Sequence, residues 1–209
     1  MNRIAENNQV TISGEITSKL HFSHEVFGEK FYTFSVKVQR LSGTFDNIPV
    51  MVSERLFNVA EEYTGLPVYI EGQFRSYNQF GEFKNRVILS VFARKILLLD
   101  EEEKNPKSNQ IHLNGYICKR PVCRQTPLGR EIADLLLAVN RPYGKSDYIP
   151  CICWGRNARY AESLEVGTRL SLAGRIQSRE YTKQISETEQ EQRVAYEVSV
   201  SRIEILYDE

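Results

Sequence analysis

The sequence repeats itself at a nearly constant interval, and this feature constrains the fold more than any other. Gly14 and Gly115 lie 101 positions apart, as do Arg40 and Arg141. Further matches are Asn8-Gln9-Val10 with Asn109-Gln110-Ile111, Gly28 with Gly129, Ile48-Pro49 with Ile149-Pro150, then Gly65 with Gly167 and Gly72 with Gly174 at an offset of 102, and Val91, Ile96 and Leu97 with Val200, Ile205 and Leu206 at 109. The chain is therefore predicted to be an internal duplication, with seven extra residues in the second copy between Gly174 and Val200.

A polar segment separates the two copies. Residues 100–108 read Asp-Glu-Glu-Glu-Lys-Asn-Pro-Lys-Ser, and such a segment buries too little apolar surface to offset the entropy of ordering it. We therefore expect an N-terminal unit over residues 1–99, an acidic and polar linker over 100–108, and a C-terminal unit over 109–209. Each unit has about 100 residues, a size that can fold by itself.

Each copy is expected to be rich in strands. Val10, Ile12 and Ile16 alternate with polar residues, the pattern of a half-buried strand. Residues 55–63 and 156–164 lack Gly and Pro, show helical spacing and precede a glycine, which predicts one short helix in each copy. The opening strand has its counterpart at 111–117. The other expected strands are 31–39, 48–52, 67–74 and 87–97, with their counterparts 132–140, 148–154, 168–176 and 195–206. Three strands, a helix and two strands are the order of an oligonucleotide-binding (OB) barrel, so the predicted fold is all-β, two tandem OB-fold barrels.

Composition excludes several classes of protein. No run of about 18 apolar residues exists, so no transmembrane helix and no membrane partner are expected. The polar N-terminus is not a secretory signal, and the four cysteines are expected to be reduced thiols in a cytoplasmic protein. Basic and acidic residues number 27 each, which argues against binding through bulk positive charge but not against binding through base stacking.

Three blocks of the second copy resemble the bacterial single-stranded DNA-binding (SSB) protein family. They are Leu137 to Tyr143, Asp147 to Arg156, and Gly167 to Tyr181, in that order. The resemblance implies non-enzymatic binding of single-stranded DNA in replication, recombination or repair, by a bacterial protein associated with the nucleoid. It also implies that four barrels share one DNA strand, so a two-barrel chain is expected to form a homodimer.

Candidate contact residues follow from the chemistry of single strands, whose bases stack on aromatic rings while cations neutralise the phosphates. Tyr148 and Trp154 lie an even number of residues apart and so share one strand face. A lone tryptophan is more often a core residue, but Tyr148 and the resemblance favour a contact. The resemblance also places Tyr143 and Tyr181 at two further stacking positions. The predicted phosphate partners are Arg141, Lys145, Arg156, Arg175 and Arg179.

The first copy departs from this pattern. It carries Ser42, Asn47 and Ser53 at the positions that correspond to Tyr143, Tyr148 and Trp154 of the second copy. Its own aromatics gather around residues 77–83, at Tyr77, Phe80 and Phe83. They either line a DNA path, with Tyr77 and Phe80 as contacts, or pack against a partner barrel. We favour packing, and expect a degenerate binding face on a chiefly structural barrel.

Catalytic and metal motifs are not expected. Gly144-Lys145-Ser146 resembles the end of a phosphate-binding loop, but Val139 stands where that loop needs glycine. Cys118, Cys123, Cys151 and Cys153 lack the spacing of zinc knuckles, and the last two are expected to be buried thiols. The sequence therefore predicts no enzyme, cofactor, metal or small-molecule substrate.

Two other functions remain open. One is an OB-fold accessory protein, primosome-type or RNA-directed, that acts mainly through protein contacts. The other is an OB-barrel interaction protein that has lost nucleic-acid binding. The SSB family usually ends in a flexible acidic tail with an apolar tip, and this sequence ends at Leu206-Tyr207-Asp208-Glu209. Recruitment of partner enzymes through such a tail is therefore not expected.

Overall fold

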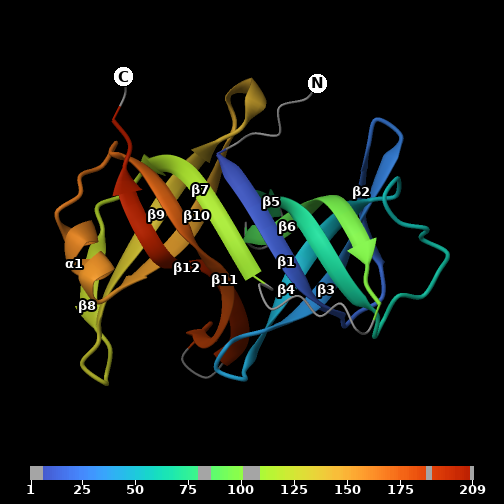
Figure 1. Cartoon of the computed structure of the whole chain (residues 1–209), viewed down its shortest axis with the longest axis horizontal. Coiled ribbons are helices and arrows are strands. Elements are labelled where there is room, and N and C mark those ends of the chain that lie inside the picture. Colours follow the sequence, from blue (N-terminus) through green and yellow to red (C-terminus); the bar gives the residue numbers. More distant parts are fainter. Residues whose placement is uncertain (1–6, 80–85, 101–108, 187–189, 208–209) are drawn as a thin grey trace.

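Strands account for nearly all of the regular structure. The computed structural model describes residues 7–79, 86–100, 109–186 and 190–207 (Figure 1). The first copy contains β1 (Asn8–Ile16), β2 (His21–Val26), β3 (Glu29–Gln39), β4 (Phe45–Ser53), β5 (Pro67–Gln79) and β6 (Arg86–Leu98). The second contains β7 (Asn109–Ile117), β8 (Val122–Gln125), β9 (Glu131–Asn140), η1 (Pro142–Gly144), β10 (Ser146–Trp154), α1 (Arg156–Glu162), β11 (Arg169–Gln184) and β12 (Gln190–Ile205).

The strands form two barrels joined by one strand pair. Their order in the sheet is β2-β3-β4-β6-β5-β1-β7-β11-β12-β10-β9-β8. Additional pairings of β1 with β3 and of β7 with β9 close the sheet on itself in each half. The two closed halves are OB-fold barrels, which confirms the predicted fold class.

An approximate two-fold axis relates the barrels. It passes through the antiparallel β1–β7 pair, in which Val10 faces Ile111, its own counterpart in the repeat. In Figure 1 these two strands run side by side between the barrels, with β2 and α1 at opposite ends of the molecule. The duplication seen in the sequence is therefore also a symmetry of the fold.

One repeated pair of glycines marks a bend in each barrel. The register shifts next to Gly72 on β5 and at Gly174 on β11. A Cβ atom at either glycine would collide with a backbone oxygen of the neighbouring strand, that of Phe92 or Ser199. Glycine is needed at these two positions because the backbones approach too closely for any side chain.

The core follows the alternation predicted from the sequence. On β7 the side chains of Ile111, Leu113 and Ile117 are buried, while those of His112 and Tyr116 are exposed. The inward faces of both barrels belong to one cluster of buried apolar residues that runs through the β1–β7 junction. The hydrophobic effect therefore stabilises the two barrels together.

The helix predicted over residues 55–63 does not form. This stretch consists of turns, whereas the second copy has α1. The side chain of Asn58 accepts a hydrogen bond from the amide of Ala60, and that of Ser53 accepts one from the amide of Arg55. Such local bonds stabilise turns at the expense of a helix. The prediction of one helix per barrel was therefore wrong for the first barrel.

Two strands and one offset also differ from the expectation. β2 and β8 were not predicted, because every one of their side chains is exposed and no alternation marks them. The pairing of Ile70 with Ile96 and of Leu172 with Ile203 relates the last strands by 107 positions instead of 109. The second hairpin therefore contains five extra residues, and not seven.

The predicted linker lies outside the described residues except for Asp100, which is exposed. Within the described ranges, no helix is long and apolar enough to cross a membrane.

Candidate nucleic-acid interface

A groove that contains the chain's one tryptophan and four arginines crosses the outer face of the second barrel. It measures about 470 Å³ and is lined by Arg40, Arg130, Trp154, Arg175, Gln177, Ser178, Arg179 and Ser199. We call it the Trp154 groove. Most of its lining comes from β10, β11 and β12, but Arg40 belongs to the first barrel. In Figure 1 the loop between β3 and β4 lies beside the β11–β12 hairpin, which explains how Arg40 reaches the groove.

The alternation of β10 aims Trp154 into this groove. Cys151 and Cys153 point inward and are buried, while Trp154 remains 37% exposed. The indole Nε1 donates a hydrogen bond to Ser199 Oγ on β12 at 3.3 Å, so the ring is held at a fixed position. Trp154 therefore lies on the exposed side of β10, opposite the buried Cys151 and Cys153.

Two of the four cysteines, Cys151 and Cys153, are buried thiols, whereas Cys123 is exposed. Cys151 and Cys153 are free, and burial raises the pKa of the Cys153 thiol to about 12. Burial also raises the pKa of Cys151 well above its ordinary value. Over the described part of the chain, no group of three or more His, Cys, Asp or Glu side chains is placed to hold a metal ion.

Arg175 and Arg179 supply charge next to the indole. Burial lowers the pKa of Arg175, and its buried Nη1 has no hydrogen-bond partner, although Asp46 Oδ2 lies 3.7 Å away. The Arg179 side chain is half exposed, and its Nε lies 3.9 Å from Glu197 Oε1. Glu197 is buried and accepts a hydrogen bond from Gln177 at 2.7 Å. Two buried carboxylates, Asp46 and Glu197, therefore lie behind the cations of the groove.

Arg141, a predicted phosphate partner, instead joins the two barrels. Its Nε donates to Asp147 Oδ2 at 2.6 Å, and its Nη2 donates to the backbone oxygen of Ser76 in the first barrel at 2.7 Å. Asp147 in turn accepts a hydrogen bond from the amide of Ser76 at 2.6 Å. Because these bonds occupy Nε and Nη2 of Arg141, the structure gives this side chain a structural role that the sequence did not indicate.

The same arrangement occurs on the other side of the two-fold axis. Arg40 donates to Asp46 at 2.7 and 2.5 Å and to the backbone oxygen of Ser178 at 3.0 Å. Asp46 accepts hydrogen bonds from the amide and hydroxyl of Ser178 at 2.6 and 2.9 Å. We call these two arrangements the arginine clasps. In each, an Arg–Asp pair of one barrel holds a serine of the other.

Tyr143 and Tyr148 lie near the junction of the barrels and do not line the Trp154 groove. Tyr143 is fully exposed in η1 with a φ of 64°. Tyr148 is half exposed, and its amide donates to Ser76 Oγ of the first barrel at 2.8 Å. The sequence indicated that both tyrosines act with Trp154, but it did not indicate that Tyr148 contacts the first barrel.

The remaining predicted contacts of the second barrel do not line the groove. Lys145 and Arg156 are exposed, near η1 and at the start of α1 respectively. Tyr181 is partly exposed on the β11–β12 hairpin, with the Arg179 guanidinium 5.9 Å from its ring centroid. Arg40 and Arg130 line the groove but were not predicted. The sequence repeat showed that Arg40 corresponds to Arg141, but it did not show that the Arg40 side chain contacts the second barrel.

In the first barrel, Tyr77 is partly buried, and burial raises its pKa. Phe80 and Phe83 lie outside the described residues, as does most of the hairpin that joins them.

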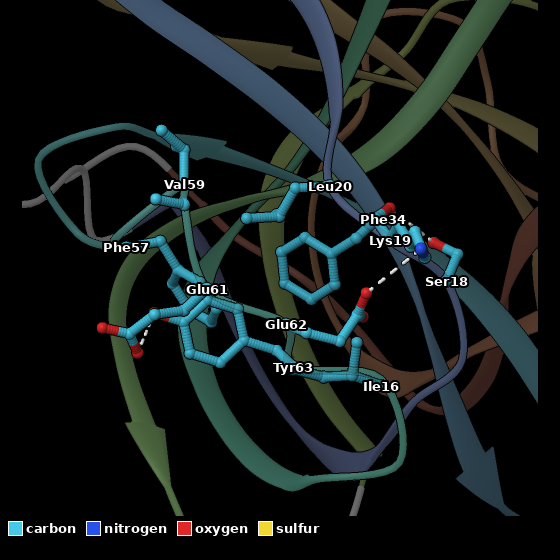
Figure 2. A pocket seen from close by; sticks show the side chains of 11 residues that line it. Ile16, Ser18, Lys19, Leu20, Phe34, Phe57, Val59, Glu61, Glu62 and Tyr63 are labelled. Atoms are coloured by element: carbon cyan, nitrogen blue, oxygen red, sulfur yellow. Dashed lines mark hydrogen bonds and ion pairs between the residues drawn. The ribbon is translucent and has the colours of Figure 1, made fainter.

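A second, smaller pocket lies at the end of the first barrel (Figure 2). It measures about 240 Å³, and its wall includes the aromatic rings of Phe34, Phe57 and Tyr63. Lys19, the only cation of the wall, is paired with Glu62 at 3.4 Å. With both Glu61 and Glu62 in its wall, the pocket is not suited to phosphate.

The strand order defines a two-barrel protein with the OB fold, and the Trp154 groove lies on its second barrel. Sequence comparison agrees with this fold, because residues 108–206 match the model of the family described as "Single-strand binding protein family". The matched residues are those of the second barrel, so the similarity to that family concerns this barrel.

Individual relatives and structures show how far the similarity extends. The single-stranded DNA-binding protein of Halalkalibacterium halodurans is 36% identical over 80 residues, which are 35% of this chain and 48% of that protein. Single-stranded DNA-binding protein A of Bacillus subtilis is 36% identical over 83 residues, 36% of this chain and 48% of that protein. The chain thus spans about half the length of these curated relatives. The wild-type single-stranded DNA-binding protein of Thermus aquaticus has the same fold over 97% of this chain and 94% of its own, with a TM-score of 0.74 and 22% identity.

Proposed function

We propose that the protein binds single-stranded DNA without catalysing a reaction, by stacking bases on Trp154 and holding phosphates with the arginines around it. One observation carries this proposal: an indole and three arginines outside the clasps, Arg130, Arg175 and Arg179, line the same open groove. Every base has an apolar face that stacks on an aromatic ring, so binding of this kind tolerates any sequence. Local cations suffice for the phosphates, which reconciles the groove with a net charge of zero over the whole chain.

We further propose that the exposed residues around the groove extend the DNA path. Tyr181 and Arg179 would continue it along the β11–β12 hairpin, and Arg156 would contact phosphates near α1. Tyr148, Tyr143 and Lys145 would continue it toward the first barrel. Their exposure and the spacing of the family resemblance support this extension.

The test is a titration of the purified chain with fluorescent oligo(dT), oligo(U) and duplex DNA at several salt concentrations. We expect single strands to bind more tightly than the duplex, with log affinity falling against log salt at a slope of about −2 to −4 for the second barrel. Preference for oligo(U) would indicate an RNA-directed protein. Duplex binding of equal strength, or no binding to any probe at low salt, would overturn the proposal and favour an interaction protein.

We propose that two chains associate into a homodimer with four barrels, and that residues 1–99 and 109–209 are separate domains joined by a linker over 100–108. The support is the four-barrel assembly implied by the family resemblance and the polar composition of the linker. Sedimentation equilibrium would measure the mass, and a monomer at micromolar concentration would contradict the dimer. Limited proteolysis should cut first within residues 100–108.

In the cell we propose a cytoplasmic, nucleoid-associated protein that acts in replication, recombination or repair. A fluorescent fusion that stays away from the nucleoid after DNA damage would contradict this assignment.

A further inference from the structure

The outer face of the first barrel carries aromatic rings on different strands from those of the second barrel. On the second barrel, Trp154 of β10 pairs with Ile132 of β9. The corresponding pair on the first barrel is Ser53 with Phe31, so the aromatic side chain has moved to the neighbouring strand β3. β4, the strand of Ser53, pairs with β6 on its other side, and there Phe92 occupies the position of Ser199 in the second barrel. The first barrel therefore lacks an aromatic residue at Ser53 but has one on each of the two strands that pair with β4.

These rings form a contiguous group in which His24 and Phe31 are stacked and Phe31 and Phe92 are tilted by 36°. The ring of exposed His24 lies nearly parallel to that of Phe31, with centroids 5.0 Å apart and planes 11° apart. The centroid of Phe31 lies 5.9 Å from that of Phe92. Phe31 and Phe92 are both partly exposed, and the apolar side chain of Met51 is buried on the strand between them.

Two arginines lie against this group of rings. The guanidinium carbons of Arg75 and Arg94 are 4.1 and 5.0 Å from the centroid of Phe92. Arg94 has no partner across the strand pair, because it is the extra residue of the bulge opposite Glu71 and Gly72. Bulges commonly re-aim a side chain, and here the bulge leaves Arg94 beside the ring. We call His24, Phe31, Phe92, Arg75 and Arg94 the Phe92 surface.

In the described part of the chain, Arg75 bonds the Gln73 side chain at 2.6 Å and feels the charge of Asp147 only at longer range. Among the described residues, no carboxylate lies within ion-pair distance of Arg75 or Arg94. The position of Glu197, one of the two buried acids behind the Trp154 groove, is occupied by Ser90 in the first barrel. Burial and the charges of Arg94 and Arg141 lower the pKa of Arg75 to about 10, so a bound anion would relieve repulsion there.

We propose that the Phe92 surface is a second binding site for single-stranded nucleic acid, in which bases stack on the His24–Phe31–Phe92 rings and the two arginines hold phosphates. Aromatic rings and guanidinium planes are the side chains on which unpaired bases stack. This inference rests on the proposed function, and it replaces the expectation of a degenerate face on the first barrel. The site needs neither Tyr77 nor Phe80.

The experiment compares two double variants of the full-length chain. Phe92→Ala/Arg94→Gln removes one ring and one charge from the Phe92 surface. The matched control, Phe22→Ala/Lys95→Gln, removes an exposed ring on β2 and an exposed cation paired with Glu71, in the same barrel. Each protein is titrated with an oligo(dT) long enough to reach both barrels, and binding is followed by anisotropy of the labelled DNA and by the emission of Trp154.

We expect the Phe92→Ala/Arg94→Gln variant to bind about ten-fold more weakly than the control, with a salt slope smaller by about 0.7. Quenching of Trp154 at saturation should be unchanged, because the second barrel is intact. Equal affinity and slope in the two variants would overturn the second site alone. Absence of both binding and quenching in the unaltered chain would instead overturn the proposed function.

A single substitution covers the case in which Phe92→Ala lowers thermal stability. Arg94→Gln alters only an exposed bulge residue, and its control is Lys95→Gln. The salt slope should fall by about 0.7 for Arg94→Gln and stay unchanged for Lys95→Gln. A slope that does not change for Arg94→Gln would overturn the contact.

Discussion

The two barrels share a scaffold but distribute their aromatic and charged side chains differently. The second barrel places one indole on β10 and surrounds it with arginines from β11 and from the other barrel. The first barrel places its rings on the flanking strands β3 and β6 and its cations on β5 and at the bulge of β6. The difference teaches that rings and cations can be supplied by neighbouring strands. A position-by-position comparison of the two copies therefore misses such a surface.

The barrels are alike where they meet. Both arginine clasps use the same three residue types, and the asparagines Asn8 and Asn109 each bond both backbone groups of the strand beside them, at Phe74 and Ile176. These contacts follow the two-fold axis, whereas the two outer faces do not.

The largest effect should come from removing the carboxylate of either clasp. Asp46 and Asp147 are fully buried, so Asp46→Ala and Asp147→Ala each leave a partly buried arginine and a backbone donor without their acceptor. Each substitution should lower the free energy of unfolding by about 3 kcal/mol. Urea denaturation of the full chain measures this. The control Asp134→Ala breaks the exposed pair with Arg124 and should cost less than about 1 kcal/mol. Equal costs for Asp134 and Asp46 would show that the clasps do not stabilise the junction.

A smaller effect of the same clasp should appear as acid sensitivity. Burial acts to raise the pKa of Asp46, but hydrogen bonds from Arg40 and Ser178 outweigh it and hold the pKa below its ordinary value. The stabilisation is therefore complete above the unfolded pKa of about 3.9 and is lost as the pH falls through the folded pKa. Unfolding free energies between pH 2 and 6 should show this loss in the unaltered chain, and Asp46→Asn should reduce it. An identical pH profile for Asp46→Asn would contradict the assignment.

Replacing the indole should separate binding from folding. Trp154→Ala should weaken oligo(dT) binding by about 1–3 kcal/mol, the usual value of one base–aromatic stack. Its cost in stability should stay below the roughly 3–5 kcal/mol of a buried tryptophan, because the ring is 37% exposed. In the unaltered chain, DNA should quench the emission of this one tryptophan in a saturable and salt-reversible way.

Trp154→Phe is the conservative control and should retain most of the affinity. Bound DNA without quenching, together with a large loss of stability in Trp154→Ala, would make Trp154 a structural residue and leave the second barrel without its central contact.

The smallest effect should come from a single groove cation. Arg130→Ala should lower the salt slope by about 0.7, since one phosphate contact is lost, with little change in melting temperature. Arg202→Ala, which removes an exposed arginine paired with Glu204 outside the groove, should leave the slope unchanged. If both variants change the slope equally, the groove is not the path of the phosphates.

Much of the fold could be predicted because it depends on local spacing. The repeat of Gly14 at Gly115 and the alternation around Val10 and Ile111 are visible along the chain, and each strand needs only its own residues to show two faces. The same reasoning placed Trp154 outward and Cys153 inward, as the structure has them. It did not detect β2, whose exposed side chains carry no alternation, or the turns at Asn58.

The tertiary structure decided which side chains meet. Arg40 and Ser178 are 138 positions apart, and Phe31 and Phe92 are 61 apart, yet strand pairing and the two-fold axis bring each pair into contact. No spacing rule indicates such neighbours, because they depend on the parallel pairing of β4 with β6 and on the β1–β7 junction. The sequence by itself determined the duplication, the barrels and the faces of their strands. Only the packing of one barrel against the other decided that Arg141 joins them, that Arg40 lines the Trp154 groove, and that Phe31 and Phe92 form one surface.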